Sequence, residues 1–179
     1  SDWSSDVCSS DLLKAAWGTP PPVRKADRYD VKHRLNVSNG RAGIAKRLQS
    51  GEAGTDTWVT ENISSGGVGA IADNTKSQWL SVGKLVGMSV EGGSGACSVG
   101  VVRRLGRRAN MQSSVGIRTL AKMAIPVTFG GVAPQEAILL NDDRQLRDEV
   151  LVCLNPGGFD KRIGPMLELD GEKYLLVPQ

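Results

Sequence analysis

The chain has 179 residues, 40% of them hydrophobic, and carries a formal net charge of +3 at pH 7. This length suits one domain, or one domain with an appendage, and the hydrophobic content suffices for a core. Only 4% of the residues are aromatic, which argues against stacking surfaces for single-stranded nucleic acid, and no apolar run approaches the ~20 residues that cross a bilayer.

Residues 1–12 read SDWSSDVCSSDL, a string similar to the translation of a common sequencing-adapter oligonucleotide, and we set them aside as a non-native leader. Without their three aspartates, 16 acidic residues stand against 22 basic ones, a net charge of about +6 that favours an anionic partner. Residues 13–23 contain three successive prolines and predict an extended linker to an upstream domain or protein partner. No secretory signal is visible, so we expect a cytoplasmic protein without membrane contact.

Arg24 and Arg28 form an R-x-x-x-R pattern in a charged segment after this linker. A guanidinium can hold a phosphate, or the O6 and N7 edge of guanine, through two parallel hydrogen bonds, and it can also stack on a base. Alternating apolar and polar residues predict the first strand over residues 31–37. Apolar residues at helical spacing, ending before Gly51, predict a short helix over residues 41–50.

The strand expected over residues 57–63 leads into an N-x-S-x-x-G pattern made by Asn62, Ser64 and Gly67. The amide of Asn62 offers a donor and an acceptor to a base edge, and Ser64 adds a hydroxyl. Gly66 and Gly67 permit backbone angles that other residues avoid, and they let the main chain approach a ligand closely. Taken alone, each pattern is better explained by solvated charges or a turn, whereas the two together favour binding.

Apolar segments separated by glycine turns predict further short strands over residues 68–72, 80–88, 97–105 and 114–120. Such short strands favour a closed barrel, which has no open edges. Beyond the barrel, residues 126–179 are expected to form a β-rich extension or second subdomain. It contains apolar segments over residues 134–141 and 144–154 and a hairpin around Asp170 and Gly171.

Several side chains are expected to serve structure rather than chemistry. Cys97 and Cys153, in surroundings rich in valine and leucine, are expected to be reduced core residues. Trp58 and Trp79 are expected in the core or in a lid, with Trp79 able to pack near a binding pocket. His33 has no partners that would make a zinc site and is expected to be a partly exposed strand residue.

The two patterns, in this order and followed by ENISSGGVGAI, LSVGKLVGM, VGVVRRL and SVGIRTL, resemble the PilZ domain family over residues 24–120. The resemblance implies a mainly β fold, with a small antiparallel β-barrel and one short helix over residues 24–125. It also implies a bacterial signal-transduction protein that binds the nucleotide cyclic di-GMP and needs no further cofactor. The ligand contacts implied by the resemblance come from Arg24, Arg28, Asn62, Ser64, Gly66 and Gly67, with the two leader arginines closing over the nucleotide on the barrel wall.

Two alternatives stay open. A PilZ-like barrel that has lost ligand binding would act as a protein-interaction module through its apolar outer surface and its C-terminal extension. A nucleic-acid-binding barrel would use the cluster Arg103, Arg104, Arg107 and Arg108. This cluster is better explained as a solubilising hairpin end, from which one arginine could still assist the ligand. The sequence shows no paired carboxylates, no nucleophile with a base and no metal-ligand spacing, so we expect neither an enzyme nor a metal site.

Overall fold

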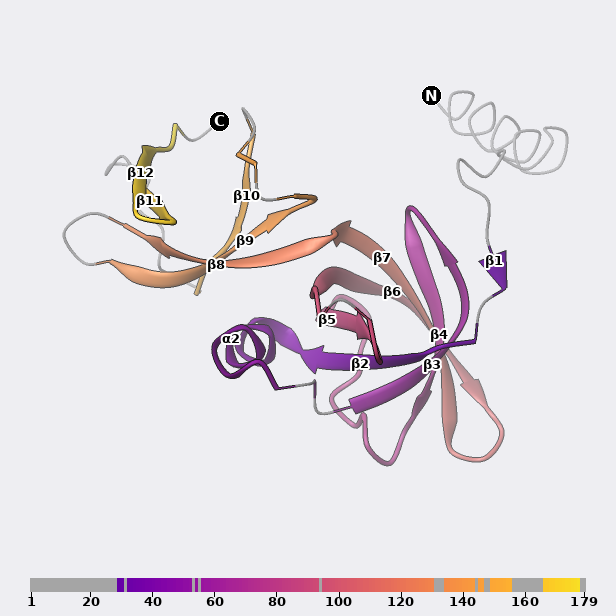
Figure 1. Ribbon diagram of the computed structural model, residues 1–179. Helices are drawn as coiled ribbons and strands as arrows, with labels where there is room; N and C mark the ends of the chain where they lie inside the picture. Colours follow the sequence, from indigo (N-terminus) through magenta and orange to yellow (C-terminus); the bar gives the residue numbers. More distant parts are fainter. Residues whose placement is uncertain are drawn as a thin grey trace, which may run out of the picture.

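The computed structural model describes residues 29–30, 32–52, 54, 56–93, 95–130, 134–143, 145–146, 149–155 and 166–177. In it the chain forms a closed six-stranded antiparallel β-barrel, followed by a five-stranded antiparallel sheet (Figure 1). The predicted mainly β fold with a small barrel is thereby confirmed. The predicted leader, the proline linker and the arginine pair, all within residues 1–28, lie outside the described residues.

The barrel strands are β2 (Arg34–Asn39), β3 (Asp56–Ser64), β4 (Gly67–Asp73), β5 (Leu85–Val90), β6 (Ser98–Arg108) and β7 (Gln112–Ala121). They pair in the order β3-β2-β5-β6-β7-β4, and pairing of β4 with β3 closes the barrel. A two-residue strand, β1 (Tyr29–Asp30), pairs with the end of β3. Exposed His33 lies between β1 and β2, so the strand predicted over residues 31–37 is interrupted there.

The barrel core follows from the alternation of side chains along each strand, because neighbouring residues point to opposite faces. Leu35 and Val37 of β2 are buried, as is Trp58 of β3, whereas Val59 is 42% exposed. The fully packed interior consists of Leu35, Val37, Trp58, Ala70, Ala72, Val86, Met88, Val102, Val115 and Ile117. Residues adjacent to these in the same strands therefore form the outer wall.

A tryptophan pair and a buried carboxylate stabilise one end of the barrel. The rings of Trp58 and Trp79 stack with centroids 5.9 Å apart. Trp79 Nε1 donates a hydrogen bond to Asp56 Oδ2 over 2.6 Å, and Ser77 Oγ donates to the same oxygen over 2.9 Å. Trp58 Nε1 donates to Ser77 Oγ, also over 2.9 Å. The predicted core position of Trp58 is confirmed.

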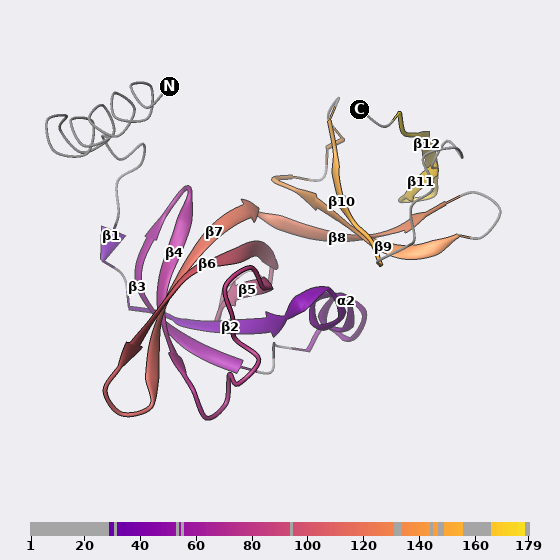
Figure 2. The same ribbon diagram turned by 180° about the vertical axis from the view of Figure 1, so that it is seen from behind.

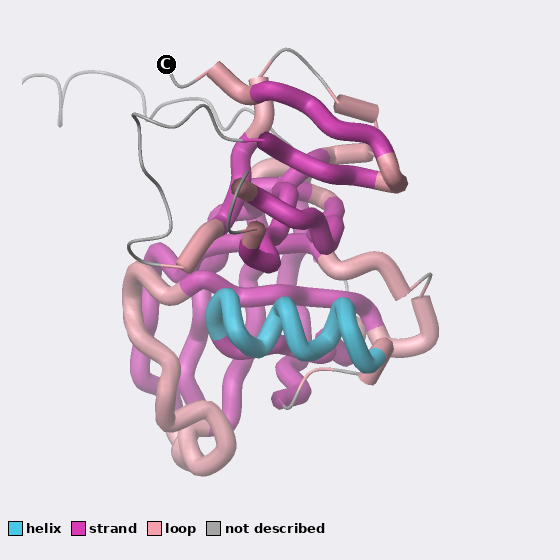
Figure 3. Tube along the Cα trace, turned by 90° about the vertical axis from the view of Figure 1, so that its left-hand side faces the viewer, coloured by secondary structure: helices cyan, strands magenta, loops and turns pink. Residues whose placement is uncertain are grey.

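The helix α2 (Gly40–Ser50) follows β2 directly and ends at Gly51, whose left-handed backbone (φ 70°) lets its N–H donate to the Arg47 carbonyl. This confirms the helix predicted over residues 41–50. Figure 3 shows α2, in cyan, lying across the outside of the strands. Its fully buried Ile44 belongs to a cluster shared by barrel and second sheet: Cys97, Val99, Ala121, Ala124, Ile138 and Leu140. The helix therefore joins the two β-structures.

Both described cysteines contribute to this junction. Cys97 is buried, whereas Cys153 is half-buried against the cluster around Ile44. Burial raises the pKa of the Cys97 thiol, and the positive charge of Arg47 opposes that effect. Burial likewise raises the pKa of Cys153. Both cysteines are free in the described structure; the predicted core position is confirmed for Cys97, whereas Cys153 is only half-buried.

The second sheet has the order β10-β9-β8-β11-β12. Its strands are β8 (Met123–Phe129), β9 (Gln135–Asn141), β10 (Leu151–Cys153), β11 (Met166–Leu169) and β12 (Glu172–Leu175). Only Lys122 separates β7 from β8, so the chain runs from the barrel straight into the second sheet (Figure 2). The hairpin predicted at Asp170 and Gly171 is confirmed, and both residues have positive φ (53° and 81°), which matches a type I′ turn.

The structure differs from the sequence-based expectations in three segments. No strand was assigned over residues 123–129, which form β8 and pair with β9 and β11. Strand β11 pairs only with Thr128 and Phe129, so Pro126 lies beyond that pairing. The segment 80–88 is a strand only from Leu85, since Ser81 and Lys84 close a turn before it. In segment 144–154, only residues 151–153 of those described form a strand.

Candidate functional site

A hollow of about 610 Å³ lies on the outer wall of the barrel, where β3, β4, β7 and β6 run side by side. We call it the wall hollow. It is lined by Glu61, Asn62, Ser64, Gly66, Gly67, Val68, Gly69, Arg103, Arg104, Leu105, Gly106, Ser114, Val115, Gly116, Ile117 and Arg118. Four of the six residues predicted to bind a ligand are among these.

Two paired glycines give the wall hollow a floor without side chains. Gly69 of β4 lies opposite Gly116 of β7 in the sheet register. A Cβ atom on Gly69 would lie 2.8 Å from Oδ1 of Asn62, and one on Gly116 would lie 3.2 Å from Nε of Arg104. The Asn62 amide and the Arg104 guanidinium therefore lie directly against this floor. A ligand above these two glycines would therefore meet the side chains of Asn62 and Arg104.

Irregularities in two strands bring polar side chains to this face. The pairing of β3 with β4 shifts between Thr60 and Asn62, and the pairing of β6 with β7 shifts between Val102 and Arg104. A bulge adds one residue to a strand and changes which way the following side chains point. Val102 is fully buried, yet Arg103 and Arg104 are both exposed. Two successive arginines thus reach the outer wall.

The β3–β4 hairpin forms the rim of the wall hollow. Ser64 Oγ donates a hydrogen bond to the Gly67 carbonyl over 3.3 Å, and the Thr119 N–H donates to the Gly66 carbonyl over 3.1 Å. A Cβ on Gly67 would lie 2.4 Å from the carbonyl oxygen of Ile117, whereas one on Gly66 would meet nothing within 4 Å.

Neither rim glycine uses the left-handed backbone region. The expectation that Gly66 and Gly67 supply unusual backbone angles was therefore wrong. Gly67 is needed because β7 approaches it closely, and Gly66 leaves open space at the rim.

The wall hollow carries an excess of positive charge. Arg108 Nη1 lies 2.8 Å from Oε1 of Glu61, so the carboxylate of Glu61 is neutralised by that ion pair. Arg103, Arg104 and Arg118 form no ion pair with any described residue. Three exposed guanidinium groups are therefore left to attract an anionic ligand.

The structure brings together Asn62, Ser64, Gly66 and Gly67, as the N-x-S-x-x-G pattern predicted. The other two predicted residues, Arg24 and Arg28, lie outside the described residues. The chain enters the described region beside the site, because Tyr29 pairs with Ile63 and Asp30 pairs with Asn62.

Sequence reasoning undervalued the arginine cluster. Its members were expected at a hairpin end. Arg107 and Arg108 do lie there, directly before the turn between β6 and β7, whereas Arg103 and Arg104 lie further back in β6 and line the wall hollow. The sequence does contain a signal for this position, the arginine pair directly after the apolar run VGVV. Two adjacent arginines interrupt the alternation of inward and outward side chains that a regular strand shows. Trp79, which was considered for this site, does not line it.

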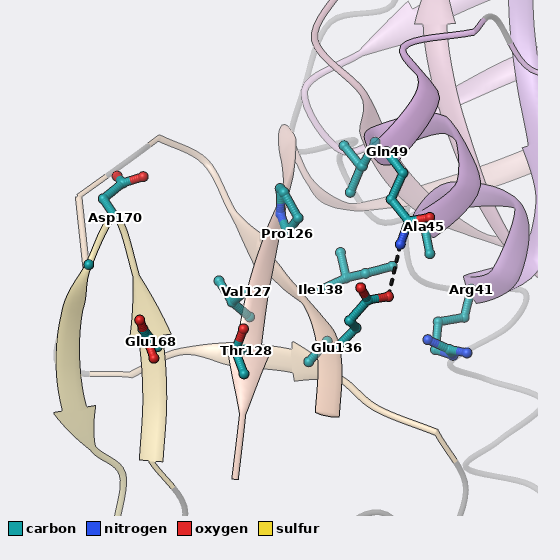
Figure 4. A pocket seen from close by; sticks show the side chains of 13 residues that line it. Arg41, Ala45, Gln49, Pro126, Val127, Thr128, Glu136, Ile138, Glu168 and Asp170 are labelled. Carbon is teal, nitrogen blue, oxygen red and sulfur yellow. Dashed lines mark hydrogen bonds between the residues drawn. The ribbon is translucent and has the colours of Figure 1, made fainter. Parts of the chain in front are cut away.

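A second pocket, of about 310 Å³, lies between α2 and the second sheet (Figure 4). Across it Gln49 Nε2 donates a hydrogen bond to Glu136 Oε2 over 2.8 Å. Glu136, Glu168 and Asp170 give it an acidic lining that contrasts with the wall hollow. None of the four predicted ligand-binding residues that the structure describes lines it.

Comparison of the sequence with protein-family models finds no match, and no curated protein matches it. Among the residues that the structure describes, no three His, Cys, Asp or Glu side chains gather where they could hold a metal ion. Over the same residues, no helix has the length and apolar character to cross a membrane.

Proposed function

We propose that this protein is a cyclic di-GMP sensor and that the nucleotide binds in the wall hollow. The observation that carries the proposal is the convergence of the N-x-S-x-x-G residues and three exposed arginines on one glycine floor. The ligand's chemistry is complementary to that surface. Cyclic di-GMP has two phosphodiester anions, and each of its two guanines presents O6 and N7 as acceptors.

Different side chains of the wall hollow can bind the phosphates and the guanine bases. Arg104 can form paired hydrogen bonds with a phosphate or with the O6 and N7 edge of guanine. Arg118, on the neighbouring strand opposite Gly67, adds a second cation. The Asn62 amide, which lies against Gly69, can pair with a base edge.

The leader supplies the remaining contacts in this proposal. Arg28 directly precedes Tyr29, whose backbone pairs with Ile63 next to Asn62. Arg24 stands four residues earlier, a stretch that spans at most about 14 Å, so both guanidinium groups can reach the wall hollow. Closure of the leader over the nucleotide would hold this segment against the barrel and signal to a preceding domain or partner.

Calorimetric titration of the full chain with cyclic di-GMP tests the proposal. We expect saturable binding that Arg28→Ala and Arg104→Ala each weaken about tenfold or more, since a hydrogen bond to a charged group contributes about 1.5–3 kcal/mol. Arg107→Ala is the matched control, because Arg107 is an exposed arginine of the same strand that does not line the wall hollow. Absence of heat at high nucleotide concentration, or equal effects of Arg104→Ala and Arg107→Ala, would refute the proposed site.

A further inference from the structure

A separate polar pocket of about 280 Å³ lies at the flank of α2, and it shares no residue with the wall hollow. We call it the α2 pocket. It is lined by Ser38, Asn39, Gly43, Lys46, Arg47, Ser50, Glu52 and Gly54. Four of these residues, from Gly43 to Ser50, follow one face of the helix at spacings of three and four.

Ser38 contributes a buried hydroxyl group that has no partner. Val37 points into the barrel core, so its neighbour Ser38 faces outward beneath α2, where it is only 2% exposed. A Cβ on Gly43 would lie 3.4 Å from the Ser38 carbonyl carbon, which shows how closely the helix covers this residue. Among the described residues, no group forms a hydrogen bond with Ser38 Oγ. Buried hydroxyl groups are normally paired.

Arg47 contributes a second buried group without a partner. Its Nη2 donates a hydrogen bond to Ser89 Oγ of β5, which anchors the guanidinium beneath the helix. Its Nη1 is buried and meets no acceptor among the described residues. Two side chains that line one pocket thus each have one buried polar atom without a partner among the described residues, and the guanidinium can only donate.

The charges around the α2 pocket favour an anion. Lys46 and Arg47 line it, opposed by the exposed carboxylate of Glu52, and no ion pair joins these three groups. The pocket also includes Asn39 and Gly43 at the start of α2, the positive end of the helix dipole. The Asn39 side chain makes no capping hydrogen bond. Two cationic side chains therefore stand against one carboxylate in the lining of this pocket.

We propose that the α2 pocket binds a phosphate group, either inorganic phosphate or a phosphomonoester. A tetrahedral oxyanion presents several acceptor oxygens, so it can accept hydrogen bonds from Ser38 Oγ and Arg47 Nη1 together. Because Ile44 of the same helix packs against both the barrel and the second sheet, a bound phosphate stabilises α2 at the junction of the two. This site is independent of nucleotide binding in the wall hollow.

Thermal unfolding and calorimetry of the full chain test this site, with inorganic phosphate and glycerol phosphate each compared with chloride at equal ionic strength. Either phosphate should raise the unfolding midpoint, and the tighter binder identifies the source of the phosphate group. Ser38→Ala should weaken binding about tenfold without lowering the midpoint in chloride, since it removes an unpaired hydroxyl. Ser81→Ala, at an exposed serine outside the pocket, is the matched control.

Glu52→Gln should change phosphate affinity in the opposite direction to Ser38→Ala. Removing this carboxylate should tighten phosphate binding about twofold to fivefold, the scale of an exposed charge interaction. The proposal is overturned if phosphate stabilises the chain no more than chloride does. Water, rather than phosphate, would then be the partner of Ser38 Oγ and Arg47 Nη1. It is also overturned if Ser38→Ala keeps the full phosphate effect.

Discussion

Two adjacent glycines at the rim of the wall hollow should respond differently to the same substitution. In Gly67→Ala the new methyl group would lie 2.4 Å from the carbonyl oxygen of Ile117 on β7. In Gly66→Ala the methyl group would meet no atom within 4 Å. Neither glycine has a left-handed backbone, so alanine is free of backbone strain at both positions. The difference between the two variants therefore isolates the steric clash.

The size of the clash follows from the contact distance. Cβ atoms essentially never come closer than 3.0 Å to another heavy atom, so relief requires a shift of at least 0.6 Å from 2.4 Å. The obstructing atom belongs to the β7 backbone at the place where Gly67 pairs with Arg118. A side-chain rotation cannot relieve the contact, and the two strands have to move apart. Overpacking of this kind costs about 1–3 kcal/mol.

Thermal unfolding followed by circular dichroism measures the effect. For a chain of this size each kcal/mol corresponds to about 2–4 °C, so Gly67→Ala should melt about 2–12 °C below the wild type. Gly66→Ala should stay within about 0.5 kcal/mol of it. Equal midpoints for the two variants, or a larger loss for Gly66→Ala, would show that the close approach of β7 does not determine the choice of glycine.

Three further variants test the core and the helix junction. Asp56→Ala should lower the free energy of unfolding by about 3 kcal/mol, because it removes the charged acceptor of both Trp79 and Ser77; tryptophan fluorescence in urea measures it, and an unchanged midpoint contradicts it. Ile44→Ala should cost about 2–5 kcal/mol in the same assay, since the side chain is fully buried. The raised pKa of Cys97 predicts stability that is complete below the ordinary thiol pKa of about 9 and is lost as the pH rises through the folded value. Cys97→Ala should therefore reduce the alkaline decline in stability, and an identical pH profile would contradict this cause.

Much of the candidate site was predictable because its pattern is local. Asn62, Ser64 and Gly67 stand within six residues on one hairpin, so any β-hairpin there would bring them together. Arg103 and Arg104 were undervalued because their position depends on a bulge in β6 and on the pairing of that strand with β7. Such pairing joins segments that are distant in sequence, and alternation within a single strand does not reveal it.

The sequence by itself determined the features that depend on neighbouring residues. Alternating side chains specified most barrel strands, helical spacing specified α2, and Asp170-Gly171 specified a hairpin, because each reflects a local backbone preference. Only the tertiary structure decided where these elements meet: the glycine floor of the wall hollow, the strand containing Pro126, and the burial of Ser38 beneath α2. These features arise from strand register and packing between distant segments, and their free energy is defined only once the whole chain has folded.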